Sequence, residues 1–400
     1  MVTNIKSLNE IDLSRPDLIF FIVWTIPLIL LQFFNLDFFV DLTSATQLLI
    51  FTNILSFFII YWIIKKSLKN KTPSVLINLK FKLNKVQNFF KFYFIIWLFL
   101  YTITIFFSGG IPIYWILSGS GLTYYDFGVP TLSGFLNMLR AFLSVLALII
   151  FLRSKNKKYL FFVFFFFISA FIFEANRGGG VVLILHILGY YFLTRNFNFI
   201  RVLKFLIFSF LFIIFLGLIE MFRYSNDEEY NFIEKYSEME LIEDANNLTL
   251  FTIPAILYIT TPLQNLNLLI ASDQEPLYYP YHSSKPLIPT FVRDKIFSNP
   301  KDYGFLVSEA YNTTSFYTPL IRDFGNYITI IIVFFLQIIV SYIHIKSKTS
   351  DLKTYTLLYP PLFMCVFLSP FNLYFTSLVV VSYPLMVHLF IHHKQVVFKI

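Results

Sequence analysis

Ten long apolar segments constrain the fold of this chain more than any other feature of its sequence. Each holds about 15 to 21 residues, close to the roughly 20 apolar residues that a helix needs to cross the hydrocarbon layer of a membrane. The shorter segments require flanking residues or a locally thinner bilayer. We therefore expect about ten transmembrane helices. They lie near residues 18–36, 47–64, 89–107, 135–152, 159–173, 180–194, 204–222, 326–345, 355–369 and 372–392.

The composition supports a membrane protein and excludes several other classes. Hydrophobic residues make up 57% of the chain and charged residues only 14%, against roughly 25% charged residues in soluble domains. The alternating segments of about 10 residues that a transmembrane β-barrel requires are not found. With one cysteine, Cys365, neither an intrachain disulfide nor a cysteine-based metal site is possible. The expected class is an all-α polytopic membrane protein.

Basic residues mark every second connection between the predicted spans. Alternate connections, such as 37–46 and 108–134, hold acidic residues and no lysine or arginine. Because basic residues favour the cytoplasmic side, both termini are predicted to be cytoplasmic. The net charge of +8 is therefore a topology signal and does not indicate a nucleic-acid partner. The basic residues that mark the inner side are Lys65, Lys66, Lys69, Lys71, Lys80, Lys82, Lys85, Arg153, Lys155, Lys157, Lys158, Arg195, Arg201, Lys204, Lys346, Lys348, Lys353, Lys394 and Lys399.

One connection, residues 223–325, is far longer than the others and falls on the outer side. It contains most of the chain's 23 acidic residues, but also apolar and aromatic sequences such as YYPYHSS and LIPTFVRDKIF. These are too hydrophobic for a disordered segment, so we expect a folded external helical cap. It separates a membrane part at 1–222 from the last spans at 326–400, within one membrane domain. Its uncharged stretch 248–270 is expected to lie on the outer membrane surface.

Four segments bring arginine to the level predicted for the outer leaflet. Arg140 lies inside the span 135–152, where a guanidinium costs at least ~2.5 kcal/mol on insertion scales. The other three stand at the outer ends of predicted spans, each near an acid. Simple ion pairs or an N-cap would explain them, whereas Arg140 has no such explanation. These pairs are Arg177 with Glu174, Arg223 with Glu220, and Arg322 with Asp323.

The arginines together suggest that a polyanion binds just inside the outer leaflet. A guanidinium binds phosphate oxygens through two parallel hydrogen bonds. In the sequence FIFEANRGGG, Gly178 and the glycines after it would let backbone N–H groups face an anion at a helix start. The outer loop 109–135 is rich in Tyr, Trp, Gly and Ser, which suits a sugar-binding wall as well as an ordinary interfacial loop.

Several of these stretches resemble the oligosaccharide repeat-unit polymerases, also called O-antigen or Wzy-type polymerases. The resemblance covers residues of about 105 to 345 and rests on the order and sidedness of short motifs. It implies a bacterial cell-membrane glycosyltransferase with a metal-independent, C-type fold. The motifs are GGIPIYW (109–115), DFGVPTLSGF (126–135), ANRGGG (175–180), MFRY (221–224) and SFYTPLIRDFGNY (315–327).

The resemblance implies roles for individual residues and for the substrates. Arg177, Arg223 and Asp323 match the family's motif residues and are the predicted catalytic group, although Asn176 stands where family members often have serine. No acid matches a catalytic base, so Asp323, Glu174 and His282 remain open candidates. The substrates would be undecaprenyl-diphosphate-linked oligosaccharides, with no cofactor or metal and with a chain-length regulator as a possible partner. The predicted substrate-binding residues are Arg140, Glu174, Gly178, Tyr224, Arg293, Arg322 and His282.

Two other functions compete with a polymerase that makes lipopolysaccharide O-antigen, capsule or exopolysaccharide. An O-antigen ligase also uses an outer cap, arginines and often a histidine. A flippase or other lipid-linked glycan transporter would place charged residues through the whole membrane depth and carry an internal repeat, neither of which is found. A non-catalytic scaffold would leave Arg140 unexplained.

Overall fold

The computed structural model describes most of the predicted membrane part and portions of the predicted external loop. It describes residues 11–33, 39–68, 82–195, 197–198, 200–204, 247–272, 274–288, 292, 295–297, 305–307, 312–350 and 353–392. Within these ranges the chain is helical, and its β-structure is limited to an isolated bridge between Ile11 and Phe197. The predicted span 204–222 falls almost entirely outside them.

The helices follow the predicted apolar segments closely. Six of them are long and apolar enough to cross a membrane, namely α1 (Pro16–Phe33), α2 (Ser44–Leu68), α3 (Leu83–Ser108) with its continuation to Ser118, α5 (Leu132–Ser154), α7 (Arg177–Thr194) and α13 (Tyr317–Thr349). This confirms a multi-pass membrane protein with an all-helical fold. Short elements are α4 (Pro112–Ser118), η1 (Tyr124–Asp126) and α11 (Tyr281–Ser284).

Three predicted spans form shorter helices. The segment 159–173 becomes α6 (Lys157–Ile168) followed by a π-helical turn, η2 (Ser169–Phe173). The last two become α14 (Lys353–Phe367) and, after the 3-10 turn η5 (Tyr374–Thr376), α15 (Leu378–His392). A helix of 15 residues rises only about 22 Å, less than the ~30 Å of the hydrocarbon layer. The fold therefore supports six long spans more firmly than ten.

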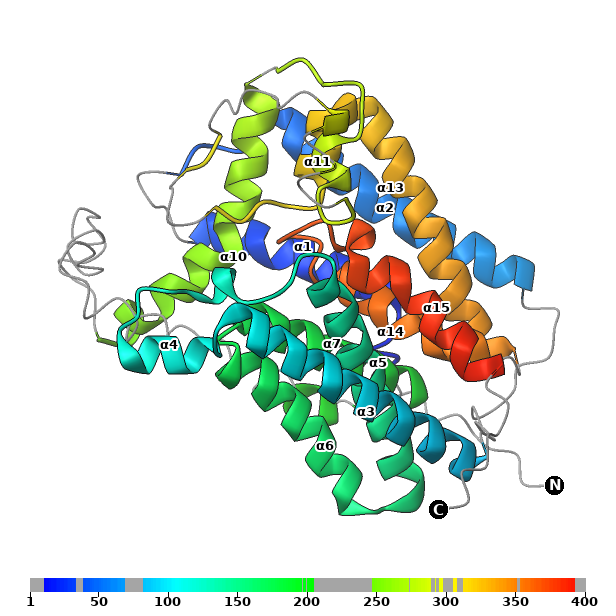
Figure 1. The fold of residues 1–400 in the computed structure, drawn as a ribbon. Helices are drawn as coiled ribbons and strands as arrows, with labels where there is room; N and C mark the ends of the chain where they lie inside the picture. Colours follow the sequence, from blue (N-terminus) through cyan, green and yellow to red (C-terminus); the bar gives the residue numbers. More distant parts are fainter. Residues whose placement is uncertain are drawn as a thin grey trace, which may run out of the picture.

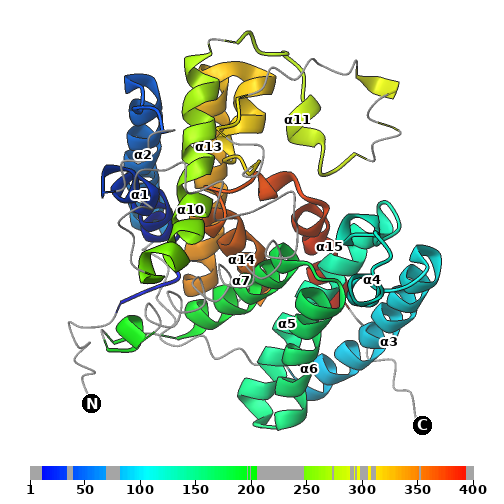
Figure 2. The same ribbon diagram turned by 90° about the vertical axis from the view of Figure 1, so that its left-hand side faces the viewer.

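The helices form two hydrophobic cores that share α7. One core joins α1, α2, α13 and α14 with α10 (Asn247–Ala271), and the other joins α3, α5, α6 and α15. Figure 2 shows the first group at upper left and the second at lower right. Leu185 of α7 packs in the first core and Leu183 in the second. A Cβ on Gly189 would lie 2.9 Å from Phe363 of α14, so this glycine permits the close contact between the two helices.

Helix α10 contains the stretch that we expected to lie on the outer membrane surface. Figure 1 shows α10 on the left of the molecule, inclined to α3 and α13 in this view. Its polar side chains bind the segment before α2: Asn267 donates to the Asp41 carbonyl at 3.0 Å and accepts from the Thr43 N–H at 2.8 Å. Gln264 likewise donates to the Val40 carbonyl at 3.0 Å. The amide side chains that argued against a span therefore attach α10 to its neighbours.

Candidate functional site

A break in α13 creates the local geometry of the candidate site. Gly325 has φ 76° and ψ 174° inside this helix, a conformation that is essentially restricted to glycine. The break frees the carbonyls of the preceding turn from helical hydrogen bonds. Those of Arg322 and Asp323 instead accept the N–H groups of Leu277 at 2.9 Å and Tyr278 at 2.7 Å. The segment after α10 is thereby bound to the first turns of α13.

The Asp323 side chain makes a second attachment between the same two regions. Its carboxylate is fully buried and accepts the backbone N–H groups of His282 at 2.9 Å and Ser283 at 2.7 Å. The Ser283 hydroxyl also donates to it at 2.6 Å. Asp323 therefore caps the start of α11, a helix some 40 residues earlier in the chain. It holds His282 in place without being exposed itself.

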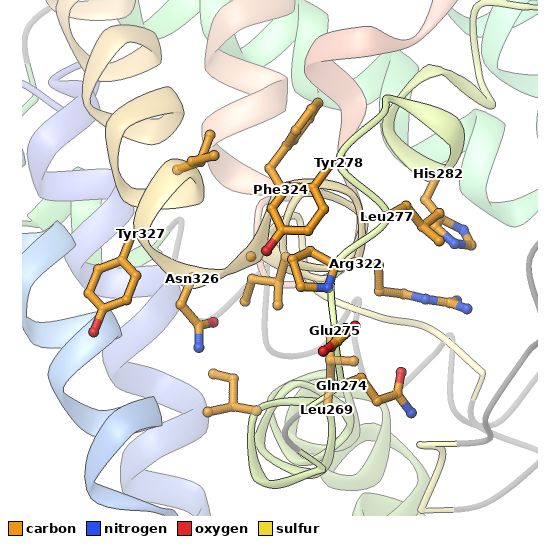
Figure 3. A pocket seen from close by; sticks show the side chains of 15 residues that line it. Leu269, Gln274, Glu275, Leu277, Tyr278, His282, Arg322, Phe324, Asn326 and Tyr327 are labelled. Atoms are coloured by element: carbon orange, nitrogen blue, oxygen red, sulfur yellow. The ribbon is translucent and has the colours of Figure 1, made fainter.

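A pocket of about 320 Å³ opens between these attached segments. It lies between the end of α10, residues 274–278 and the broken start of α13 (Figure 3). In Figure 3, Arg322 and His282 lie on one side and Asn326 and Tyr327 on the other. Its size is at the lower end of the range for ligand sites. Its polar and charged lining residues are Gln274, Glu275, His282, Arg322 and Asn326.

Aromatic rings complete the pocket. Tyr278 and Tyr327 are 74% and 87% exposed, which is unusual for side chains of this size. Exposed tyrosines offer a flat apolar face and a hydroxyl, as carbohydrate binding requires. The Arg322 guanidinium is partly exposed and lies 5.1 Å from the Phe305 ring centre. The pocket thus combines a cation and an imidazole with ring surfaces that can stack on a sugar.

Replacing Gly325 with alanine tests whether the break maintains the pocket. The new Cβ would require a strained backbone, at a cost of about 1–3 kcal/mol, and would lie 3.3 Å from Pro276. We expect a lower unfolding temperature of the purified protein in detergent. Gly178→Ala is a matched control, because its Cβ would meet only Asn176 at 3.5 Å. Equal stability of both variants would contradict the structural role of the break.

The second group of predicted residues lies at the turn between α6 and α7. Arg140 of α5 is 1% exposed and binds Glu174 through both carboxylate oxygens, with Nη1–Oε1 at 2.6 Å and Nη2–Oε2 at 3.0 Å. Its guanidinium also donates to Ser169 at 3.4 Å and to Asn137. Glu174 is 5% exposed. Glu174 therefore forms a buried ion pair with Arg140 of α5, a pairing that was not expected from the sequence.

Two glycines of FIFEANRGGG, Gly179 and Gly180, contribute to the structure of this turn. Asn176 caps α7 by accepting the Gly179 N–H at 2.8 Å. A Cβ on Gly180 would lie 2.8 Å from Phe171, so this position must remain small for α7 to pack on η2. Gly178 is exposed and Arg177 partly so. One of the backbone N–H groups that we expected to face an anion, that of Gly179, is thus already bonded to the Asn176 side chain.

The structure brings together only some of the predicted site residues. Asp323, Arg322 and His282 meet at the pocket, and Arg140, Glu174 and Arg177 meet at the turn before α7. Arg223, Tyr224 and Arg293 lie outside the described residues. Tyr278 and Tyr327 were not predicted, although the sequences YYPYHSS and DFGNY contain them. Their signal was a tyrosine two residues from a proline or a glycine, in segments predicted to lie on the outer side.

No metal site is evident in the described part of the chain. Within those ranges, His, Cys, Asp and Glu side chains form no group of three that could hold a metal ion. Cys365 is buried. No protein-family model, curated protein or solved structure matches this chain. The function must therefore be inferred from the chemistry of these residues.

Proposed function

We propose that this chain polymerises undecaprenyl-diphosphate-linked oligosaccharide repeat units by glycosyl transfer on the outer face of the cell membrane. The observation that carries the proposal is the pocket that combines Arg322 and His282 with the exposed rings of Tyr278 and Tyr327. A diphosphate requires a cation with a planar donor fork. The sugar next to it requires ring faces and small polar groups. Both requirements are met within one pocket.

The position of the pocket along α13 supports the outer side. Arg322 stands near the start of this helix and Lys346 and Lys348 near its end. The part of α13 after the break, residues 326–349, rises about 36 Å, enough to cross the ~30 Å hydrocarbon layer. Because basic residues favour the cytoplasmic side, the pocket is assigned to the outer side. Lipid-linked repeat units would reach it there, and the growing polysaccharide would leave without crossing the membrane again.

The proposed reaction is an inverting displacement at the anomeric carbon. An acceptor hydroxyl of the new lipid-linked repeat unit attacks that carbon, and the bond to the lipid diphosphate of the growing chain breaks. The electron pair leaves with the diphosphate, where arginine stabilises the developing charge. The hydroxyl proton passes to a base, for which His282 is our candidate because its imidazole lines the pocket. Growth therefore adds repeat units at the reducing end.

The remaining predicted residues take different places in this proposal. Asp323 is buried and bonded to three donors, so we assign it to positioning His282 rather than to proton transfer. Arg177 is partly exposed and remains the candidate for the second phosphate contact. Arg223 keeps the catalytic role that the sequence resemblance implies. Ten spans and a cytoplasmic location of both termini also belong to the proposal.

Replacing Arg322 with alanine tests the proposed function. We expect polymer to fall about 100-fold, at the lower end of the effect of losing one charge-stabilising donor, while single repeat units accumulate on the lipid. The measurement is the chain-length pattern of surface polysaccharide and of lipid-linked intermediates in a deletion strain that expresses each variant. Lys285→Ala is the matched control, because this exposed cation lies just after α11 and outside the pocket lining. A normal chain-length ladder in the Arg322→Ala variant would contradict the proposed function.

A ligase-type transferase is the second candidate, favoured by the imidazole of His282 in the pocket. It would use the same donor but transfer finished glycan to a lipid core. The same strains separate the two functions. Loss of a polymerase leaves single repeat units on the lipid carrier or on the surface. Loss of a ligase leaves full-length polymer on the lipid carrier.

A further inference from the structure

The turn between α6 and α7 contains a π-helical segment and a residue in the left-handed conformation. The π-helical turn η2 widens the end of α6, and its last bond joins the Glu174 N–H to the Ser169 carbonyl at 3.1 Å. The Asn176 N–H then donates to the Ala170 carbonyl at 3.1 Å. Ala175 has φ +50°, a left-handed conformation that costs a non-glycine residue energy. Such a turn persists only when surrounding contacts enforce it.

The Arg140 guanidinium supplies these contacts from a third helix. It bonds to Ser169 at the start of the turn and to Glu174 at its end. Asn137, one turn earlier on α5, accepts another of its hydrogen bonds. The planar, forked geometry of arginine makes this arrangement specific, because lysine cannot form both parallel bonds. The guanidinium therefore ties both ends of the turn to α5.

Of the two arginines at this turn, Arg177 is the more accessible. It follows Glu174 by three positions and begins α7, whose first turn is held by the Asn176 cap. Arg140 is 1% exposed, whereas Arg177 is partly exposed. A substrate can therefore reach Arg177 more readily than Arg140. Arg177 follows directly on the backbone turn whose two ends bond to Arg140.

We propose that Arg140 and Glu174 are positioning residues that fix the turn presenting Arg177 to the substrate. The binding of substrate by Arg177 rests on the proposed function. The claim that Arg140 and Glu174 hold the turn in place does not. It reassigns Arg140 and Glu174 from substrate binding to positioning. It also explains the arginine inside a predicted span, since a buried guanidinium is retained at a high desolvation cost only when its geometry is needed.

A variant without the ion pair distinguishes two roles for it, stabilising the bundle or positioning the turn. Replacing a buried ion pair by apolar residues of similar size is often neutral for stability. The double variant Arg140→Met with Glu174→Leu should therefore fold. If the pair only stabilised the bundle, this variant would keep the turn unchanged. If the hydrogen bonds position the turn, Arg177 becomes displaced or mobile in a folded protein.

The test places a cysteine at the reporting position. Cys365 is the chain's single cysteine and is buried, so Cys365→Ala with Arg177→Cys gives one reporter in the full-length protein. Its labelling rate with a maleimide is measured on the purified full-length protein in detergent, where both faces of the protein are accessible to the reagent. We compare the labelling rate in three backgrounds. These are the otherwise native chain, the Arg140→Lys variant, and the double variant Arg140→Met with Glu174→Leu. Thermal melting in detergent establishes that each variant is folded.

We expect the labelling rate to change by at least about fivefold in both pair variants, which corresponds to roughly 1 kcal/mol in the equilibrium of the turn. Unchanged rates in the folded double variant would overturn the inference, whether or not Arg140→Lys folds. Labelling requires no activity, so it separates this inference from the proposed function. A changed labelling rate with a normal polysaccharide ladder in the same pair variants would contradict the proposed use of Arg177 and leave the positioning role intact.

Discussion

Replacing Arg177 with alanine is expected to abolish polymer and leave single repeat units on the lipid carrier. Arg177 is the partly exposed arginine at the start of α7, where the helix dipole also favours an anion. Loss of one preorganised donor to a developing negative charge reduces turnover by about 10²–10³. At that rate, chain growth would not exceed the first repeat units. The chain-length ladder and the lipid-linked intermediates are the measurements.

Arg195 provides the matched control for this variant. It follows the other end of α7 and is exposed, at the side that the basic residues assign to the cytoplasm. Arg195→Ala removes the same charge from the same helix and should leave the ladder unchanged. Arg177→Lys keeps the charge and loses the fork, so we expect partial activity. A full ladder in Arg177→Ala would remove this residue from the proposed mechanism.

Replacing Asp323 with alanine is expected to have the second largest effect, through loss of the pocket. The change leaves the His282 and Ser283 N–H groups and the Ser283 hydroxyl without their acceptor. A buried donor without an acceptor costs about 1–3 kcal/mol, so the sum is large enough to detach α11 from α13. We expect a lower unfolding temperature together with loss of polymer. Thermal melting in detergent and the polysaccharide ladder measure the two effects.

Asp126 and a conservative variant provide the controls for Asp323. Asp126 also accepts local hydrogen bonds, from the Thr123 N–H at 2.8 Å and its hydroxyl at 3.1 Å, but it is exposed. Asp126→Ala should change stability little, because water replaces the lost bonds. Asp323→Asn keeps one acceptor oxygen and should fall between the native protein and Asp323→Ala. Native stability of Asp323→Ala would contradict the role of the carboxylate in holding α11.

The membrane helices could be predicted because their signal is local. A hydrocarbon layer requires about 20 apolar residues in succession, and α1, α2, α3 and α5 satisfy this within a few residues of the expected bounds. The helical turns of α13 before Gly325 were not predicted, because the expected span began at residue 326, after this glycine. The short helices α14 and α15 also differ from the expected spans, because the chain leaves the helix between Leu368 and Ser377.

The sequence by itself determined the class of protein, the position of its long helices and which segments carry arginine, because hydropathy and charge act residue by residue along the chain. Only the tertiary structure decided which arginine is accessible. Arg140 is buried against Glu174, 34 residues away, while Arg177 remains partly exposed. It likewise decided that Asp323 caps α11 and holds His282 at the pocket. These outcomes depend on contacts between distant segments, which no local pattern encodes.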